Sequence, residues 1–92
     1  MRHFSCAYII SAMKYALDGG QALHTFRTYE QDRTREQRHG TRAHLIDHDA
    51  QRLRQTARAL GIPDPVVNLE GTRLQHVELY GDALDRALKS CH

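Results

Sequence analysis

The side chains best suited to chemistry in this chain gather in one short stretch. They are His39, His44, Asp47, His48 and Asp49. Histidine and carboxylate groups are common ligands of divalent metal ions and common proton carriers in enzymes. The stretch therefore has two explanations: a metal or acid–base site, or the polar start of a helix beside a loop.

The spacing of these residues argues against a shared site. Metal ligands must converge on a point about 2 Å away. Asp47, His48 and Asp49 are consecutive at an expected strand-to-helix junction, so their side chains diverge. His44 and Asp47 are separated by an odd number of residues, which sends them to opposite faces of a strand. We therefore expect Asp47 and Asp49 to cap a helix, and we expect no catalytic residue, metal ligand or cofactor in the run.

The rest of the chain carries no recognisable catalytic motif. Cys6 has no charged neighbour that would lower its pKa, and Ser5, Ser11 and Ser90 lie in no nucleophile elbow. A glycine-rich phosphate loop is also missing from the sequence. Two cysteines are too few for a disulfide framework, so we expect Cys6 and Cys91 to be reduced and buried.

Composition indicates a single small domain spanning residues 1–92. An apolar share of 40% is too high for a disordered chain, and a net charge of +2 is unremarkable. Among thirteen basic residues only Lys14 and Lys89 are lysines, so arginine, which suits phosphates and carboxylates, dominates. The apolar run after Arg2 is broken by polar residues and lacks a cleavage site, and no stretch is long enough to span a membrane. We expect a cytoplasmic protein.

Hydrophobic periodicity predicts an α+β fold in the order α-β-β-α-β-β-α. Its helices would lie on a mostly antiparallel sheet. The clearest element is the helix around Leu53 and Leu60, which Gly61 ends. The pair Gly71-Thr72 predicts a tight hairpin turn. Asp82 is expected to cap the last helix, whose apolar face would consist of Leu84, Leu88 and Cys91. The expected elements, in order, are 5–18, 21–30, 41–47, 47–61, 66–70, 73–80 and 82–91.

A basic polar loop is expected over residues 30–42. This stretch contains no aliphatic residue and no Phe, Tyr or Trp, so it cannot belong to the core. A loop of this length is often functional. Its excess of positive charge suits a phosphate backbone or an acidic protein face. The expected partner-binding residues are Arg27, Arg33, Arg35, Arg38, His39 and Arg42.

The second half of the chain resembles an uncharacterised family of short bacterial and phage proteins. The resemblance covers residues 43–90 and rests on AHLIDHDAQRLRQTARALGIP and QHVELYGDALDRAL. The family's His-Tyr-Asp-Leu segment corresponds here to His76, Val77, Glu78 and Leu79. The resemblance supports the fold and suggests a rival site, formed by His44, His76 and Glu78 if their strands are neighbours. Such a set could bind a divalent ion or carry protons.

These observations favour a binding protein without enzymatic activity. It would dock through its arginine-rich loop onto nucleic acid or onto a protein or ribonucleoprotein complex, with direct phosphate contacts and no membrane partner. In size and composition the chain is similar to phage anti-defence proteins, including anti-CRISPR inhibitors. Two alternatives remain open: a small metal-dependent hydrolase that uses His44, His76 and Glu78, and a structural or regulatory homo-oligomer.

Overall fold

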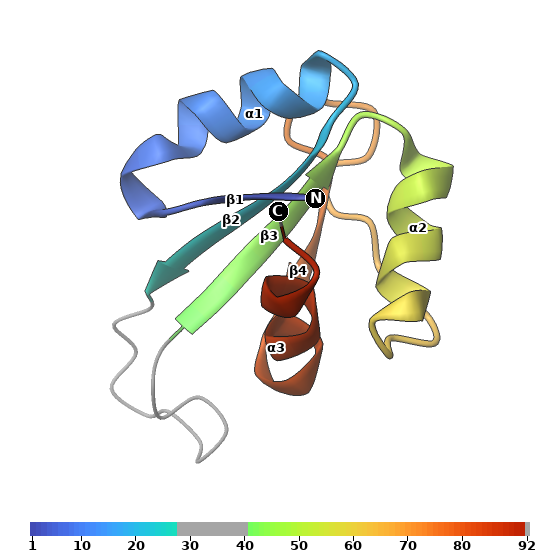
Figure 1. The fold of residues 1–92 in the computed structure, drawn as a ribbon. Coiled ribbons are helices and arrows are strands. Elements are labelled where there is room, and N and C mark those ends of the chain that lie inside the picture. Colours follow the sequence, from blue (N-terminus) through green and yellow to red (C-terminus); the bar gives the residue numbers. More distant parts are fainter. Residues whose placement is uncertain (28–40, 92) are drawn as a thin grey trace.

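Four strands form one sheet in the order β1-β2-β3-β4 (Figure 1). The structure is a computed structural model and describes residues 1–27 and 41–91. β1 runs parallel to β2, whereas the pairs β2–β3 and β3–β4 are antiparallel. The elements are β1 (Arg2–Phe4), a 3-10 turn η1 (Cys6–Tyr8), α1 (Ile9–Leu17), β2 (Gln21–Arg27), β3 (Thr41–Asp47), α2 (Ala50–Ala59), β4 (His76–Leu79) and α3 (Gly81–Lys89). The predicted α+β fold, with three helices on a mostly antiparallel sheet, is confirmed.

The sheet has a hydrophobic core on each face, because successive side chains of a strand point in opposite directions. One core joins the sheet to α2 and α3, and the other joins it to α1 (Figure 1). The first contains Leu23, Ala43, Leu45, Leu53, Ala57, Leu60, Val77, Leu79, Leu84 and Ala87. The second is smaller and contains Phe4, Ala12, Ala16, Ala22 and Ile46. The α1 core therefore covers only part of its face of the sheet.

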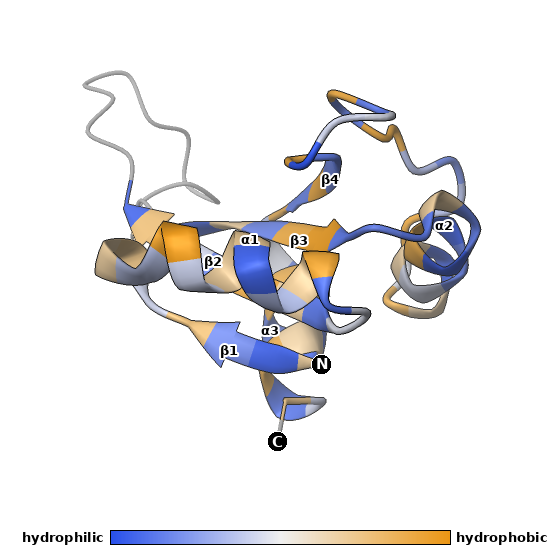
Figure 2. Cartoon of the chain, turned by 90° about the horizontal axis from the view of Figure 1, so that it is seen from above, coloured by the Kyte–Doolittle hydropathy of each residue, from blue (hydrophilic) through white to orange (hydrophobic). Residues whose placement is uncertain are grey.

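Asp47 anchors the end of β3 from a fully buried position. Its carboxylate accepts hydrogen bonds from the Arg52 guanidinium at 2.7 and 2.8 Å, from Gln21 Nε2 at 3.0 Å and from the Asp49 backbone N–H at 2.9 Å. The residue that caps α2 is Asp49, whose carboxylate accepts a hydrogen bond from the backbone N–H of Arg52. Capping by Asp49 is confirmed, while Asp47 supports the chain before the helix rather than capping it. The connection from β3 to α2 is hydrophilic, as Figure 2 shows.

The predicted hairpin before the last helix is wrong. Only one bridge, between Asn68 and His76, joins the two segments, and β4 is limited to His76–Leu79. Tight turns use the intervening backbone instead: the Thr72 N–H donates to the Leu69 carbonyl, and the Gly71 N–H donates to the Gln75 side chain. Leu69 and Gly71 have positive φ angles of 53° and 87°, which a regular strand does not allow.

The first strand was not predicted, because β1 has only three residues and shows no readable alternation. The predicted cap of α3 is also wrong: Tyr80 precedes the helix, and Asp82 lies in its first turn. Leu88 is 38% exposed, since the buried side of α3 consists of Leu84 and Ala87.

Both cysteines are free thiols in the structure. The expectation that both would be buried is wrong for Cys6, which is exposed at the surface turn η1, whereas Cys91 is half-buried. No helix in the described part of the chain is long and apolar enough to cross a membrane.

Leu53 of α2 tests this packing. It is fully buried between the helix and the sheet, so Leu53→Ala should lower the free energy of unfolding by about 2–5 kcal/mol. Gln51→Ala, at an exposed position of the same helix, should change it by less than about 0.5 kcal/mol. Urea denaturation followed by circular dichroism measures both. Equal losses in the two variants would contradict the observed helix orientation.

Candidate metal centre

Three neighbouring strands place polar side chains in one row across the sheet. His24 of β2 pairs with His44 of β3, and His44 pairs with Glu78 of β4. Paired residues of neighbouring strands point to the same side. His76, two residues before Glu78, lies on that side as well, opposite Ile46. We call this side of the sheet, which carries Ala22, His24, Phe26, Arg42, His44, Ile46, His76 and Glu78, the histidine face.

Aromatic rings surround His44 on the histidine face. Its ring centroid lies 4.1 Å from that of His76, 4.6 Å from that of Phe26 and 6.2 Å from that of His24. The α1 core takes up the neighbouring positions Ala22 and Ile46. His44 itself is half-buried, and Glu78 is exposed. The site therefore lies at the border between the packed and the open part of this face.

The fold brings the side chains of His44, His76 and Glu78 close to one another. One possible ligand atom from each of the three lies within 4.8 Å of the other two. Ligand atoms around a tetrahedral zinc ion are about 3.3 Å apart, as bond lengths of about 2.0 Å require. Small side-chain rotations would close that difference, and the exposed Glu78 is free to make the largest one. The rival set named from the sequence is thus brought together by the fold.

His76 is held in the tautomer that a metal ligand needs. Its Nδ1 lies 2.6 Å from the Leu74 carbonyl oxygen. Because a carbonyl can only accept, Nδ1 must carry the proton and donate it, which leaves the Nε2 lone pair free. Metal-bound histidines commonly have their second nitrogen fixed in this way by a backbone carbonyl.

His44 is electrically neutral over the physiological range. Burial, and after it the charge interactions with the nearby His76 and His24, lower the pKa of His44 from 6.5 to about 4. The Nδ1 atom of His44 is buried and has no hydrogen-bond partner among the described residues. A neutral imidazole with an unused ring nitrogen is the form in which histidine binds metal ions.

His24 is a member of the cluster that was not selected from the sequence. Its Nε2 donates to the Cys6 carbonyl at 3.2 Å, so its buried Nδ1 holds a lone pair without a partner among the described residues. Its ring lies farther from the three converging groups. Antiparallel pairing of the two predicted strands around one connection could have placed His24 opposite His44.

The His/Asp run does not form a single site in the described chain. Asp47 is buried on the face opposite to His44, as its odd spacing predicted. His48 and Asp49 are exposed at the start of α2. His39 lies outside the described residues, so its part in the run stays a prediction.

The segment expected to form an arginine-rich loop is described only at its two ends. Arg33, Arg35 and Arg38, and also His39, lie outside the described residues. Arg27 is the exposed last residue of β2, and its cross-strand partner is Thr41. Thr41 and Arg42 belong to β3, whose bounds are those of the strand predicted over residues 41–47, so the structure places these two residues in the sheet. The Arg42 guanidinium carbon lies 4.5 Å from the centre of the Tyr80 ring.

Comparison with known proteins gives no further assignment. No protein-family model matches the chain, and no curated protein or solved structure gives a significant match. The resemblance of residues 43–90 to an uncharacterised family therefore stays a prediction.

The lowered pKa of His44 predicts a specific pH dependence in protein freed of metal by a chelator. Between pH 6.5 and about 4 the unfolded chain binds a proton at His44 while the folded chain does not. This residue's contribution to stability is therefore complete above pH 6.5 and falls as the pH drops through that window. The His44 ring signals in an NMR titration should have a midpoint near pH 4.

His44→Gln supplies the stability comparison. The loss of melting temperature from pH 6.5 to 4 should be smaller in this variant than in the wild type. His48→Gln, at an exposed position, should leave the wild-type dependence unchanged. An NMR midpoint for His44 close to 6.5 would refute the burial argument.

Proposed function

We propose that the protein binds one divalent transition-metal ion through His44, His76 and Glu78 and uses it in a hydrolytic reaction. The observation that carries the proposal is the convergence of the three side chains, from two strands, to within 4.8 Å. The neutral state of His44 and the fixed tautomer of His76 support it, because both leave nitrogen lone pairs for a metal. The proposal follows the alternative of a small metal-dependent hydrolase and not the expectation of a binding protein without enzymatic activity.

The composition of the ligand set favours zinc or a similar ion. Two imidazoles and one carboxylate suit zinc, while calcium and magnesium prefer sets made only of oxygen atoms. Hydrolytic zinc sites commonly have three protein ligands and a water molecule in the fourth position. Glu78 lies at the exposed border of the site, so solvent and substrate can reach that position.

Hydrolysis assisted by a metal ion needs little more from the protein than three ligands and one open coordination position. An ion held by these three residues would lower the pKa of a bound water to about 7 and would polarise the bond under attack. On the side of β2, the Phe26 ring and the buried His24 reduce the access of water to His44. This strengthens the electrostatic effect of the ion, since charges interact more strongly where water is excluded.

Zinc titration tests the metal centre directly. Isothermal titration calorimetry should give one tight site in the wild type. Glu78→Gln and His44→Ala should each weaken zinc binding by more than about a hundredfold, since even outer-shell changes cost about 10–100-fold. Zinc at about 100 times its dissociation constant should add about 2.7 kcal/mol to the free energy of unfolding.

The matched control is His48→Ala, which removes an exposed histidine from the same sequence run. It should bind zinc like the wild type. Cobalt(II) provides the second measurement: azide should change the visible spectrum of the cobalt protein if one coordination position is open. Zinc binding that survives both ligand substitutions would overturn the proposal.

Docking onto an anionic partner is a second candidate. The observation in its favour is that Arg27 and Arg42 lie at the same end of the sheet, where the segment 28–40 begins and ends. This segment carries further arginines, which suit phosphate oxygens. The partner would be nucleic acid or a nucleic-acid-containing complex, as an anti-defence protein would need.

Charge reversal of Arg35 and Arg38 to glutamate tests the docking candidate. Binding to a generic RNA or DNA oligonucleotide should weaken, and the wild-type affinity should fall steeply with salt, with a log–log slope of about −0.7 to −0.9 per phosphate neutralised. Zinc binding and melting temperature should be unchanged. Equal binding of the oligonucleotide by wild type and variant would exclude this role.

A further inference from the structure

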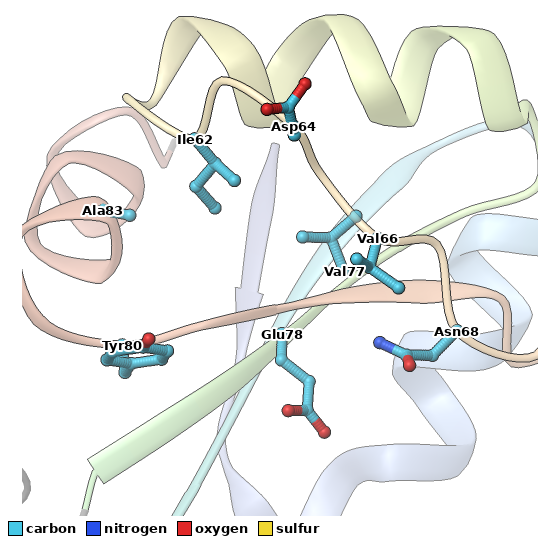
Figure 3. A pocket seen from close by; sticks show the side chains of 8 residues that line it. All are labelled: Ile62, Asp64, Val66, Asn68, Val77, Glu78, Tyr80 and Ala83. Atoms are coloured by element: carbon cyan, nitrogen blue, oxygen red, sulfur yellow. The ribbon is translucent and has the colours of Figure 1, made fainter.

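The outer edge of β4 forms one side of a pocket next to the metal centre. The pocket has a volume of about 460 Å³. Figure 3 shows Val77 and Glu78 on opposite sides of the strand, with Val66 next to Val77 and Asp64 near Ile62. Glu78 thus belongs both to the pocket wall and to the converging metal ligands. A group bound in the pocket would adjoin the metal ion.

The walls of this pocket differ between its two ends. Ile62, Val66 and Val77 supply apolar surface, with Val66 69% exposed. Pockets of about 300–1,000 Å³ that are mostly apolar with a few polar groups are typical of small-molecule sites. Glu78 and Tyr80 lie at the side toward the histidine face, whereas Asp64 lies farther along the pocket (Figure 3).

Arg42 supplies a positive group beside the same site. It is two residues from His44 on β3, and both side chains belong to the histidine face. Its guanidinium stacks on Tyr80, which also lines the pocket. Among the described residues no carboxylate forms an ion pair with Arg42. Stacking fixes the plane of the guanidinium and leaves its N–H groups free for a ligand.

We infer that the metal centre acts on a phosphate monoester, with the phosphoryl group between the ion and Arg42 and the organic group in the β4 pocket. This inference rests on the proposed metal centre. A divalent ion with one carboxylate ligand keeps one positive charge, and Arg42 adds another, so the site complements a dianion. Asp64, the acidic pocket residue that is not a metal ligand, makes the pocket itself unfavourable for the phosphate and so favours its binding near the ion and Arg42.

The reaction would be hydrolysis with water as the second reactant. The water oxygen forms a new bond to phosphorus, and the bond from phosphorus to the ester oxygen breaks. The leaving oxygen takes up a proton, and the water gives one up, so the products are an alcohol or phenol and inorganic phosphate. Arg42 would bind the phosphoryl oxygens through its planar pair of N–H donors and would neutralise charge that grows on them.

Binding of phenylphosphonate, which resembles a phosphate monoester but cannot be hydrolysed in this way, tests the inference. Calorimetry on the zinc-loaded protein should give one site, absent from the metal-free protein. Arg42→Gln should weaken binding by about tenfold to a hundredfold, as expected for the loss of hydrogen bonds to a charged group. Arg42→Lys should recover only part of that loss, because lysine lacks the planar fork. Arg58→Gln, at an exposed position of α2, is the control and should bind like the wild type.

The pocket is tested separately with Val66→Glu. This exposed substitution should weaken binding of phenylphosphonate but leave that of inorganic phosphate nearly unchanged. The variants that bind phenylphosphonate more weakly should also hydrolyse para-nitrophenyl phosphate more slowly in the presence of zinc. If zinc binds but phenylphosphonate does not, or if Arg42→Gln binds it as tightly as wild type, the substrate class is wrong while the metal centre stands. If zinc itself does not bind, the metal centre is wrong too.

Discussion

The register of β3 between its two neighbours is the constraint on which the site depends. It sets His44 beside His24 on one side and beside Glu78 on the other. A shift of one residue would turn His44 toward the opposite core and separate the three groups. Two contacts at the last residue of β3 oppose such a shift: Gln21 donates to the Asp47 carboxylate, and Gln75 donates to the Asp47 carbonyl. The buried Asp47 thus secures both strand pairings at once.

The histidine face carries an energetic cost that a bound ion would relieve in part. The Nδ1 atoms of His24 and His44 are buried without partners among the described residues, and each unsatisfied buried polar atom costs about 1–3 kcal/mol. The closeness of the three histidines also makes the charged form of His44 unfavourable. A metal ion would use the neutral imidazole of His44 as a ligand, whereas the Nδ1 atom of His24 would stay without a partner among the described residues. Local conflicts of this kind are most often found at functional sites.

Sequence patterns were sufficient to predict those elements that local signals, such as hydrophobic spacing and end residues, determine. The periodicity of Leu53 and Leu60, with Gly61 after them, was sufficient for α2. The cluster of His44, His76 and Glu78 could be named from the sequence only as an alternative, because His44 and His76 belong to different strands and no local pattern shows that these strands are neighbours. Propensity also failed where turn hydrogen bonds compete with strand pairing, as at Leu69 and Gly71. The stacking of Arg42 on Tyr80, which supports the role proposed for Arg42, is a tertiary contact that no local sequence pattern reveals.

The proposed site would divide three tasks among neighbouring parts of the sheet. The β3–β4 pair brings the ligand atoms together, the end of β3 positions a guanidinium, and the outer edge of β4 offers an apolar pocket. All three depend on the same strand pairing, so a change in the register would disturb them jointly. The chain achieves this with a small core on each face of a single sheet.

The location of a bound zinc ion tests the central claim most directly. Crystals of the protein with one equivalent of zinc, measured at the zinc absorption edge, would show the ion as a peak of anomalous density. If these three residues form the metal centre, one peak will lie about 2.0–2.2 Å from a ring nitrogen of His44, a ring nitrogen of His76 and a carboxylate oxygen of Glu78. A peak held instead by Cys6, Cys91 or the His48–Asp49 pair, with His44 and His76 unligated, would contradict it.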